Sequence, residues 1–161
     1  MREVMHAAIE QLQKDFLSAE EVAASHAVMG LDSQLVEDGT YFVVEDNGVL
    51  AGCGGWSRRA TLYGGDHSAE LRDPRLLDPA TEPARVRAMY THPGFVRRGV
   101  GRMILEAAEQ AARAEGFREA ELMATLAGEP LYLACGYRPV ARTFAASSGT
   151  LVPLVMMSKS L

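Results

Sequence analysis

The sequence predicts a mixed α/β fold, a single domain with a sheet of about six to seven strands and about four flanking helices. Three observations predict it: a β-rich pair of segments surrounds a tight turn at 46–48, a strand, helix and strand follow one another over 84–125, and two more β-rich segments end the chain. A strand–helix–strand unit gives a parallel pair and hairpins give antiparallel pairs, so the sheet should be mixed.

Two helices are expected before the first strand. Residues 3–16 carry apolar and charged side chains at helical spacing. Ser18 followed by Glu21 three positions later is the signature of a capping box, and Gly30 ends the helix that begins there. A strand before these helices is either missing or very small, because the segment "MREV" is too short to indicate one.

A hairpin should follow, with strands at 40–45 and 49–56 on either side of Asp46-Asn47-Gly48, a strong tight-turn signal. Three glycines between 52 and 55 thin the second strand, which is typical of a bulge or of a close approach to the backbone. Residues 57–84 then form an insertion longer than the about 12–15 residues usual for an unstructured loop. It is either part of a pocket wall, which we favour, or a mobile surface loop.

The segment "ARVRAMYT", residues 84–91, is predicted to be a central strand. Simple alternation puts Val86, Ala88 and Tyr90 on one face. The same alternation puts Arg85, Arg87, Met89 and Thr91 on the other face.

Residues 100–115 form the clearest helix, with an apolar face and Gly116 at the stop position. A second central strand at 118–125 and a short helix at 130–135 follow. The segments "YRPVARTFAA" and "TLVPLVMMSKS" complete the sheet around an "SSG" turn.

Composition argues against several classes of protein. The 161 residues are 48% hydrophobic and 23% charged, as in an ordinary globular domain, and the net charge of −5 disfavours nucleic-acid binding, which needs a basic surface. The two cysteines lack metal-site spacing, so neither a metal nor a disulfide is expected. No apolar run approaches the roughly 18 residues of a membrane span, and we expect no membrane association and a cytoplasmic location.

The stretch "THPGFVRRGVGRMIL", residues 91–105, places two glycines among arginines where a helix begins. A helix start presents unpaired N–H groups and a partial positive charge, and glycines let an anion come close, so this stretch predicts a phosphate cradle. It matches neither a Walker loop nor a dinucleotide fingerprint. The alternative is that the glycines only permit tight packing of helix and strand.

The later stretch "LYLACGY" places Tyr132 inside the short helix just before a Gly-Tyr pair. Alone, such a tyrosine is more often a core residue. Together, "VRAMYTHPGFVRRGVGR" and "LYLACGY" make the region 86–137 closely resemble the acetyl-CoA-binding core of the GNAT N-acetyltransferase superfamily. A looser similarity extends over nearly the whole chain.

The resemblance implies a GNAT fold in which two parallel central strands splay apart in a V and acetyl-CoA, as co-substrate, lies between them. It implies direct attack of an acceptor amine on the thioester, with a backbone N–H near Met89 polarising the carbonyl and Tyr132 as the catalytic acid. The residues it implies for acetyl-CoA binding are Met89, Tyr90, Thr91, Arg97, Arg98, Gly99, Val100, Gly101, Arg102 and Thr125. No metal is implied.

The sequence departs from the family pattern at several positions. Val96 stands where the family has a leading Gln or Arg, and Thr125 stands near the position of an asparagine. The general base stays open among the acid and imidazole side chains Glu82, His67 and Asp66 and a backbone-held water. Arg85 or Arg87 either grips a carboxylate or phosphate of the acceptor or forms a salt bridge with a nearby acid, which we consider the more ordinary arrangement.

The expected partner is an amine acceptor, either a small molecule or a peptide or protein, and a homodimer paired through an exposed final strand is also conceivable. Two other functions remain open. One is a non-catalytic acyl-CoA-binding sensor of the same fold, and the other is a phosphate- or nucleotide-binding protein unrelated to CoA.

Overall fold

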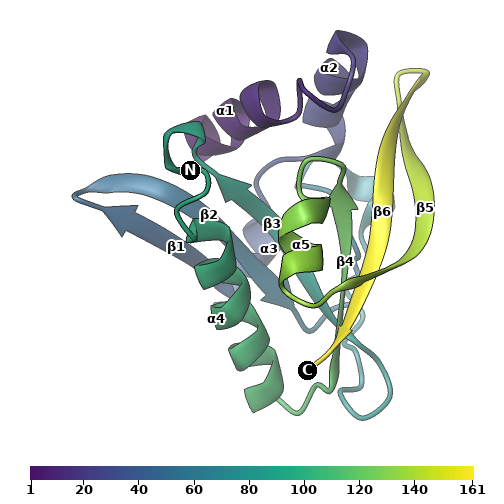
Figure 1. The fold of residues 1–161 in the computed structure, drawn as a ribbon. Helices are drawn as coiled ribbons and strands as arrows, with labels where there is room; N and C mark the ends of the chain where they lie inside the picture. Colours follow the sequence, from purple (N-terminus) through teal and green to yellow (C-terminus); the bar gives the residue numbers. More distant parts are fainter.

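A computed structural model describes all residues, 1–161, and contains one six-stranded sheet in the order β1-β2-β3-β4-β6-β5 (Figure 1). The strands are β1 (Tyr41–Asp46), β2 (Val49–Ser57), β3 (Ala84–Thr91), β4 (Glu119–Thr125), β5 (Arg138–Ser147) and β6 (Thr150–Ser160). β3 and β4 run parallel, and every other neighbouring pair is antiparallel. The predicted mixed sheet is confirmed.

Five α-helices cover the two faces of the sheet (Figure 1). They are α1 (Arg2–Leu12), α2 (Ala19–Val28), α3 (Ser33–Glu37), α4 (Val100–Ala114) and α5 (Glu129–Ala134). α1 and α2 pack on one face against Cys53 and Tyr90, whereas α4 packs on the other face against Trp56 and Val86. No helix is both long enough and apolar enough to span a membrane.

The helix signals in the sequence were sound, with two differences. Ser18 Oγ accepts the Glu21 N–H at 3.2 Å, and the Glu21 carboxylate accepts the Ser18 N–H at 2.7 Å, so the predicted capping box is present. α1 ends at Leu12, four residues before the predicted end. The five-residue helix α3 was not predicted, because so short a segment cannot display a helical period. No strand precedes α1.

The parallel strands β3 and β4 pair only at one end of the sheet. Their paired residues are Ala84 with Ala120 and Arg85 with Glu121, after which the strands diverge (Figure 1). β4 continues along β6 as far as Thr125, and β3 continues along β2, so the edge of β3 that faces β4 is left unpaired beyond residue 85. This is the V-shaped splay that the family resemblance implied.

A bulge in β3 makes the predicted alternation wrong. Arg87 pairs with Gly55 and Tyr90 pairs with Cys53, so two residues of β3 oppose the single residue Gly54, and Ala88 has φ 54°. Past the bulge every side chain changes face. Tyr90 therefore lies on the same α1–α2 face as Arg87, and its hydroxyl hydrogen-bonds the backbone of Gly30 there.

The insertion is anchored to the body of the protein by ion pairs. Arg59 binds Asp38 at 2.8 Å, and Arg58 binds Glu115 of the turn after α4 at 2.6 Å. An isolated bridge joins Arg59 to Leu76, and one 3₁₀ turn lies at Ala69–Leu71. These contacts hold the segment over the end of the sheet where β3 and β4 meet.

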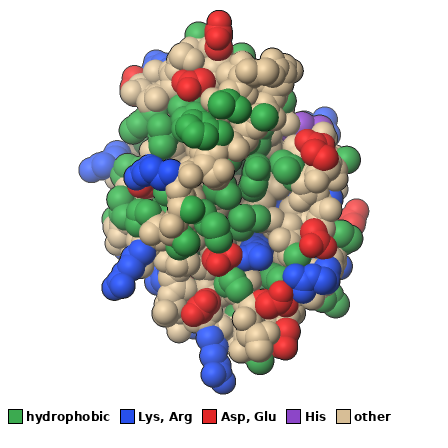
Figure 2. Space-filling view, turned by 90° about the vertical axis from the view of Figure 1, so that its right-hand side faces the viewer, with side chains coloured by type: hydrophobic (Ala, Val, Ile, Leu, Met, Phe, Trp, Pro, Cys, Tyr) green, Lys and Arg blue, Asp and Glu red, His purple; other side chains and the backbone are tan.

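The final strand is not an edge of the sheet. β6 lies between β4 and β5, so the expectation that an exposed final strand would pair with a second copy is wrong, and β5 is the edge on that side. Figure 2 shows the face presented by this side, where apolar side chains lie among charged ones. The large exposed apolar side chains of the β5–β6 hairpin are Val140, Phe144 and Leu151.

Candidate functional site

A cavity of about 570 Å³ lies where the splayed β3 meets α1, α5 and the start of α4. The predicted residues that line it are Met89, Tyr90, Thr91, Arg97, Gly99, Val100, Gly101, Arg102, Thr125 and Tyr132. Arg98 does not line it, because its guanidinium pairs with Asp46 at 3.1 Å and lies 4.8 Å above the centre of the Phe95 ring. The structure therefore brings together every predicted site residue except Arg98.

The chain forms a row of free amides as it enters α4. Arg97 and Gly99 both have left-handed backbone angles, φ 62° and 82°, and Gly99 is the N-cap of the helix. None of the N–H groups of residues 96–102 donates to an acceptor within the chain. Such a row at the positive end of a 15-residue helix can hold a diphosphate-sized anion.

The two glycines of this turn serve different purposes. Nothing lies within 4 Å of a Cβ placed on Gly99, so a side chain would have room, and a glycine is favoured there because of the positive φ. A Cβ on Gly101 would lie 2.7 Å from Cδ2 of Leu131 in α5, so the requirement there is the close approach of α4 and α5. The close contact at Gly101 is therefore between two helices, not between helix and strand as the alternative had it, and it is compatible with a cradle formed by the amides.

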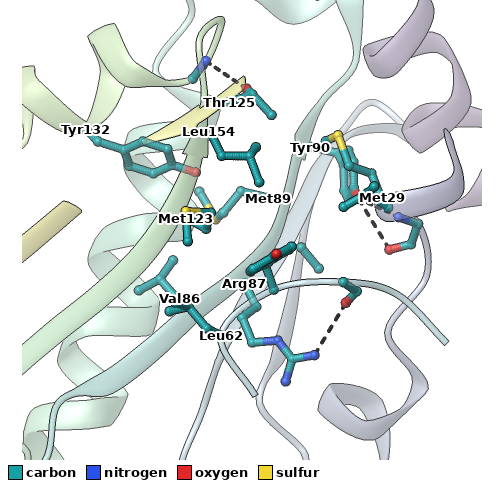
Figure 3. Close-up of a pocket in the computed structure, with 16 residues that line it drawn as sticks. Met29, Leu62, Val86, Arg87, Met89, Tyr90, Met123, Thr125, Tyr132 and Leu154 are labelled. Carbon is teal, nitrogen blue, oxygen red and sulfur yellow. Dashed lines mark hydrogen bonds between the residues drawn. The ribbon is translucent and has the colours of Figure 1, made fainter. Parts of the chain in front are cut away.

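Tyr132 faces the cavity from α5. Its side chain is buried, its ring lies edge-on to Tyr137 at 5.9 Å, and a Cβ on Gly128 would lie 3.2 Å from its Cε2. The hydroxyl has no hydrogen-bond partner in the chain and points towards Met123 and Leu154, which line a second, smaller cavity on the far side of the ring (Figure 3). Burial raises the pKa of Tyr132, so the hydroxyl stays protonated and able to donate at neutral pH.

Thr125 fixes the start of the turn that leads into α5. Its Oγ1 accepts the N–H of Gly128 at 3.1 Å (Figure 3). The Thr125 hydroxyl is therefore already engaged as an acceptor and retains its own proton to donate into the cavity that the residue lines.

A smaller cavity of about 120 Å³ shares six lining residues with the large one: Met29, Met89, Tyr90, Thr125, Gly128 and Tyr132. Its outer wall is Leu62–Gly64 of the insertion, and most of its other walls are apolar (Figure 3). The two cavities therefore adjoin at Tyr132.

The two arginines that precede the bulge in β3 are both ion-paired. Arg85 binds Glu121, its neighbour on β4. Arg87, which is 4% exposed, binds the fully buried Asp32, and Asp32 also binds Arg72 at 3.1 Å. Burial lowers the pKa of Arg87 to about 10, which leaves the guanidinium charged at neutral pH. The salt-bridge alternative is thus what the structure shows for both arginines.

The three side chains considered as general base lie elsewhere. Glu82 accepts two hydrogen bonds from Arg75, which lower the pKa of Glu82, and Asp66 accepts from the backbone and hydroxyl of Ser33. His67 lies beside Gly30 in a third cavity. Neither the large nor the small cavity has a carboxylate or imidazole side chain in its wall.

Sequence reasoning missed two residues at this site. Asp32, which compensates Arg87, sits in a loop far from Arg87 in the sequence and carries no local signal. Tyr41 donates its hydroxyl to the carbonyl of the bulged Ala88 at 3.1 Å, and only the glycines of β2 hinted at that bulge. The structure shows no group of three or more His, Cys, Asp or Glu side chains that could hold a metal ion.

Comparison with known proteins gives a family and a fold. The sequence matches the acetyltransferase (GNAT) family over residues 3–137. No curated protein matches the chain with significant similarity.

Solved structures share the fold over almost the whole chain. A GCN5-related N-acetyltransferase of Rhodopseudomonas palustris is 22% identical, with 99% of this chain and 87% of that chain covered and a TM-score of 0.71. The yncA acetyltransferase of Salmonella typhimurium, solved with acetyl-CoA, is 18% identical with coverages of 99% and 86% and a TM-score of 0.62. The paia N-acetyltransferase of Thermoplasma acidophilum, solved with coenzyme A, is 13% identical with coverages of 99% and 89% and a TM-score of 0.59.

Proposed function

The chain belongs to the acetyltransferase (GNAT) family, and on that premise we propose that it transfers the acetyl group of acetyl-CoA to an amine of a small molecule or protein. The observation that carries the proposal is the row of free amides at residues 96–102, placed at the end of an unpaired strand edge and across a cavity from Tyr132.

Each part of acetyl-CoA has a matching surface. The pyrophosphate would lie on the amides from Arg97 to Arg102. These six N–H groups, and that of Val96 just before them, have no acceptor in the chain. The pantetheine arm, with its two amide groups, would add to the free edge of β3 as an extra strand. Two structural neighbours contain coenzyme A or acetyl-CoA, which supports this choice of donor.

The reaction needs no covalent enzyme intermediate. The amine nitrogen attacks the thioester carbonyl carbon, a C–N bond forms, the C–S bond breaks, and the amine proton passes to water. The N–H of Met89, at the bulge, would polarise the carbonyl, and the Tyr132 hydroxyl would donate to the departing thiolate sulfur. A positioned acid of this kind contributes about 10²–10⁴-fold to the rate.

The test compares ligands first and turnover second. Acetyl-CoA should raise the melting temperature, whereas ATP or a sugar phosphate at the same concentration should not. CoA release should then depend on an added amine drawn from a panel. Stabilisation by ATP and not by acetyl-CoA would contradict the proposal in favour of a nucleotide-binding protein, and CoA binding without turnover on any amine would favour a non-catalytic sensor.

A further inference from the structure

The wall of the small cavity contains an arginine whose donors are only partly used. A guanidinium has five N–H groups. The Nη2 of Arg87 faces Asp32 and reaches the Gly64 carbonyl at 3.5 Å, the outer limit of a hydrogen bond (Figure 3). The Nε and Nη1 of Arg87 are buried and have no acceptor. Buried unpaired donors of a charged group are costly, so an acceptor from outside the chain would stabilise this arginine.

The charged groups around this guanidinium balance one another. The fully buried Asp32 binds both Arg87 and Arg72, and Asp66, whose side chain is 40% exposed, binds Arg72 from the surface, which makes two cations and two anions. An acceptor from outside would therefore be held by the unused N–H groups of Arg87, and not by a net positive charge of the cluster.

We propose that the acceptor is a compact amino carboxylate with an apolar side chain, and that Arg87 binds its carboxylate. This inference rests on the proposed function, since it assigns the substrate class of the same site. The Gly64 carbonyl lies 3.5 Å from Nη2 of Arg87, and the carboxylate would replace this weakly held carbonyl and accept from Nη1 and Nη2 together.

The dimensions and walls of the cavity fit such a molecule. Arg87 and Met89 lie on either side of the bulged Ala88 and both line the small cavity, so a bound carboxylate and the thioester would adjoin the same small cavity. The apolar walls of Met29, Met123 and Leu154 would contact the side chain of the acceptor. A protein substrate lacks a carboxylate next to its terminal amine and would gain nothing from Arg87.

The experiment on the unaltered protein measures CoA release from acetyl-CoA with matched acceptors. Alanine, valine and leucine are compared with their amides, which keep size and shape and remove the charge. Rates are expressed per neutral amine, because a carboxylate changes the basicity of the amine beside it. We expect kcat/KM to be about 10- to 100-fold higher for the carboxylates, as for a charged hydrogen bond. Equal values, or higher values for the amides, would overturn the inference.

Variants identify the arginine responsible. Arg87→Met is combined with Asp32→Asn so that no buried carboxylate is left unpaired, and the carboxylate preference should fall to about one. The matched control is Arg85→Met with Glu121→Gln, which removes the ion pair two residues earlier on the strand and lines neither cavity. The control should keep the preference. If the folded double variant still prefers carboxylates over amides, Arg87 is not the residue that binds the carboxylate.

Direct binding separates this inference from the proposed function. Calorimetric titration of leucine into the protein with CoA present should show saturable binding, and leucinamide should show none. Saturable leucine binding without acetyl transfer would support the carboxylate site while refuting the transferase. Amide acetylation without leucine binding would support the transferase and refute the carboxylate site.

Discussion

Replacing Tyr132 with phenylalanine tests the chemistry most directly, because the structure predicts a large kinetic effect with little structural cost. The hydroxyl has no partner in the chain, so its removal leaves no buried donor or acceptor unpaired. The ring keeps its edge-on contact with Tyr137 and its packing against Gly128. We expect the free energy of unfolding to change by less than about 1 kcal/mol.

The expected loss of kcat in Tyr132→Phe is about 10²–10⁴-fold, which is about 3–5 kcal/mol of activation free energy. Initial rates of CoA release at saturating amine measure kcat, and calorimetry measures the affinity for acetyl-CoA, which should change little because the hydroxyl acts on the departing sulfur. The ionisation of Tyr132 should not lower the wild-type rate below about pH 10, since burial raises its pKa above the ordinary value.

Tyr137→Phe is the matched control, because Tyr137 is also buried, contacts Tyr132 and lines neither cavity. Its kcat should stay within about twofold of wild type, since a buried tyrosine outside the site contributes only packing. An unchanged kcat in Tyr132→Phe would remove this residue from the chemistry. Equal losses in the two variants would assign the effect to packing of the tyrosine pair.

Three further predictions concern the amide row, the buried ion pair and the proton of the acceptor. Gly101→Asp should abolish the binding of acetyl-CoA, measured by calorimetry. Adding Leu131→Ala, which removes the steric contact, should not restore binding; if it does, the substitution acted through lost space between α4 and α5 and not through the amide row. Asp32→Ala should lower the free energy of unfolding, measured in urea, by about 3–5 kcal/mol, because it leaves the buried charge of Arg87 without a partner. Glu121→Gln, which breaks the partly exposed ion pair with Arg85, should lower it by about 1 kcal/mol or less. Equal losses in the two variants would contradict the role of burial. The pH profile of kcat/KM should shift with the pKa of the acceptor amine, because neither cavity has a carboxylate or imidazole in its wall. If kcat/KM instead falls at the same pH for amines of different basicity, a group on the protein acts as the base.

Most of the fold followed from local patterns because each element carries its own signal. The turn at 46–48, the capping box at Ser18 and the apolar face of α4 all depend on neighbours in sequence, and all three are present in the structure. The glycines of β2 indicated a bulge or a close approach, but its effect on β3 was missed because an alanine with positive φ has no signature in sequence, and this one residue reversed the face of Tyr90.

In the candidate site, too, the features that depend on neighbours in sequence were predictable and those that depend on tertiary contacts were not. The amide row at 96–102 was predictable, because a G-x-G at a helix start acts through the backbone of consecutive residues. The compensation of Arg87 by Asp32 joins residues 55 positions apart through tertiary folding, and a strand pattern contains no information on it. For the same reason, the positions of Glu82 and His67 away from both cavities became evident only in three dimensions.

The single paired end of β3 and β4 also has a mechanical meaning. The sheet consists of two three-stranded blocks, β1–β3 and β4–β6, that share backbone hydrogen bonds only around Ala84 and Arg85, where the insertion clamps the junction through Arg58 and Glu115. At the open end the two blocks share no backbone hydrogen bonds and meet through side chains, where Tyr90 of β3 and Leu154 of β6 lie in one apolar cluster with α1 and α2. A pantetheine arm bonded to β3 would add backbone hydrogen bonds at this end, so amide hydrogen exchange in residues 86–91 should slow when acetyl-CoA binds, while exchange around Ala84 and Arg85 should stay as it is.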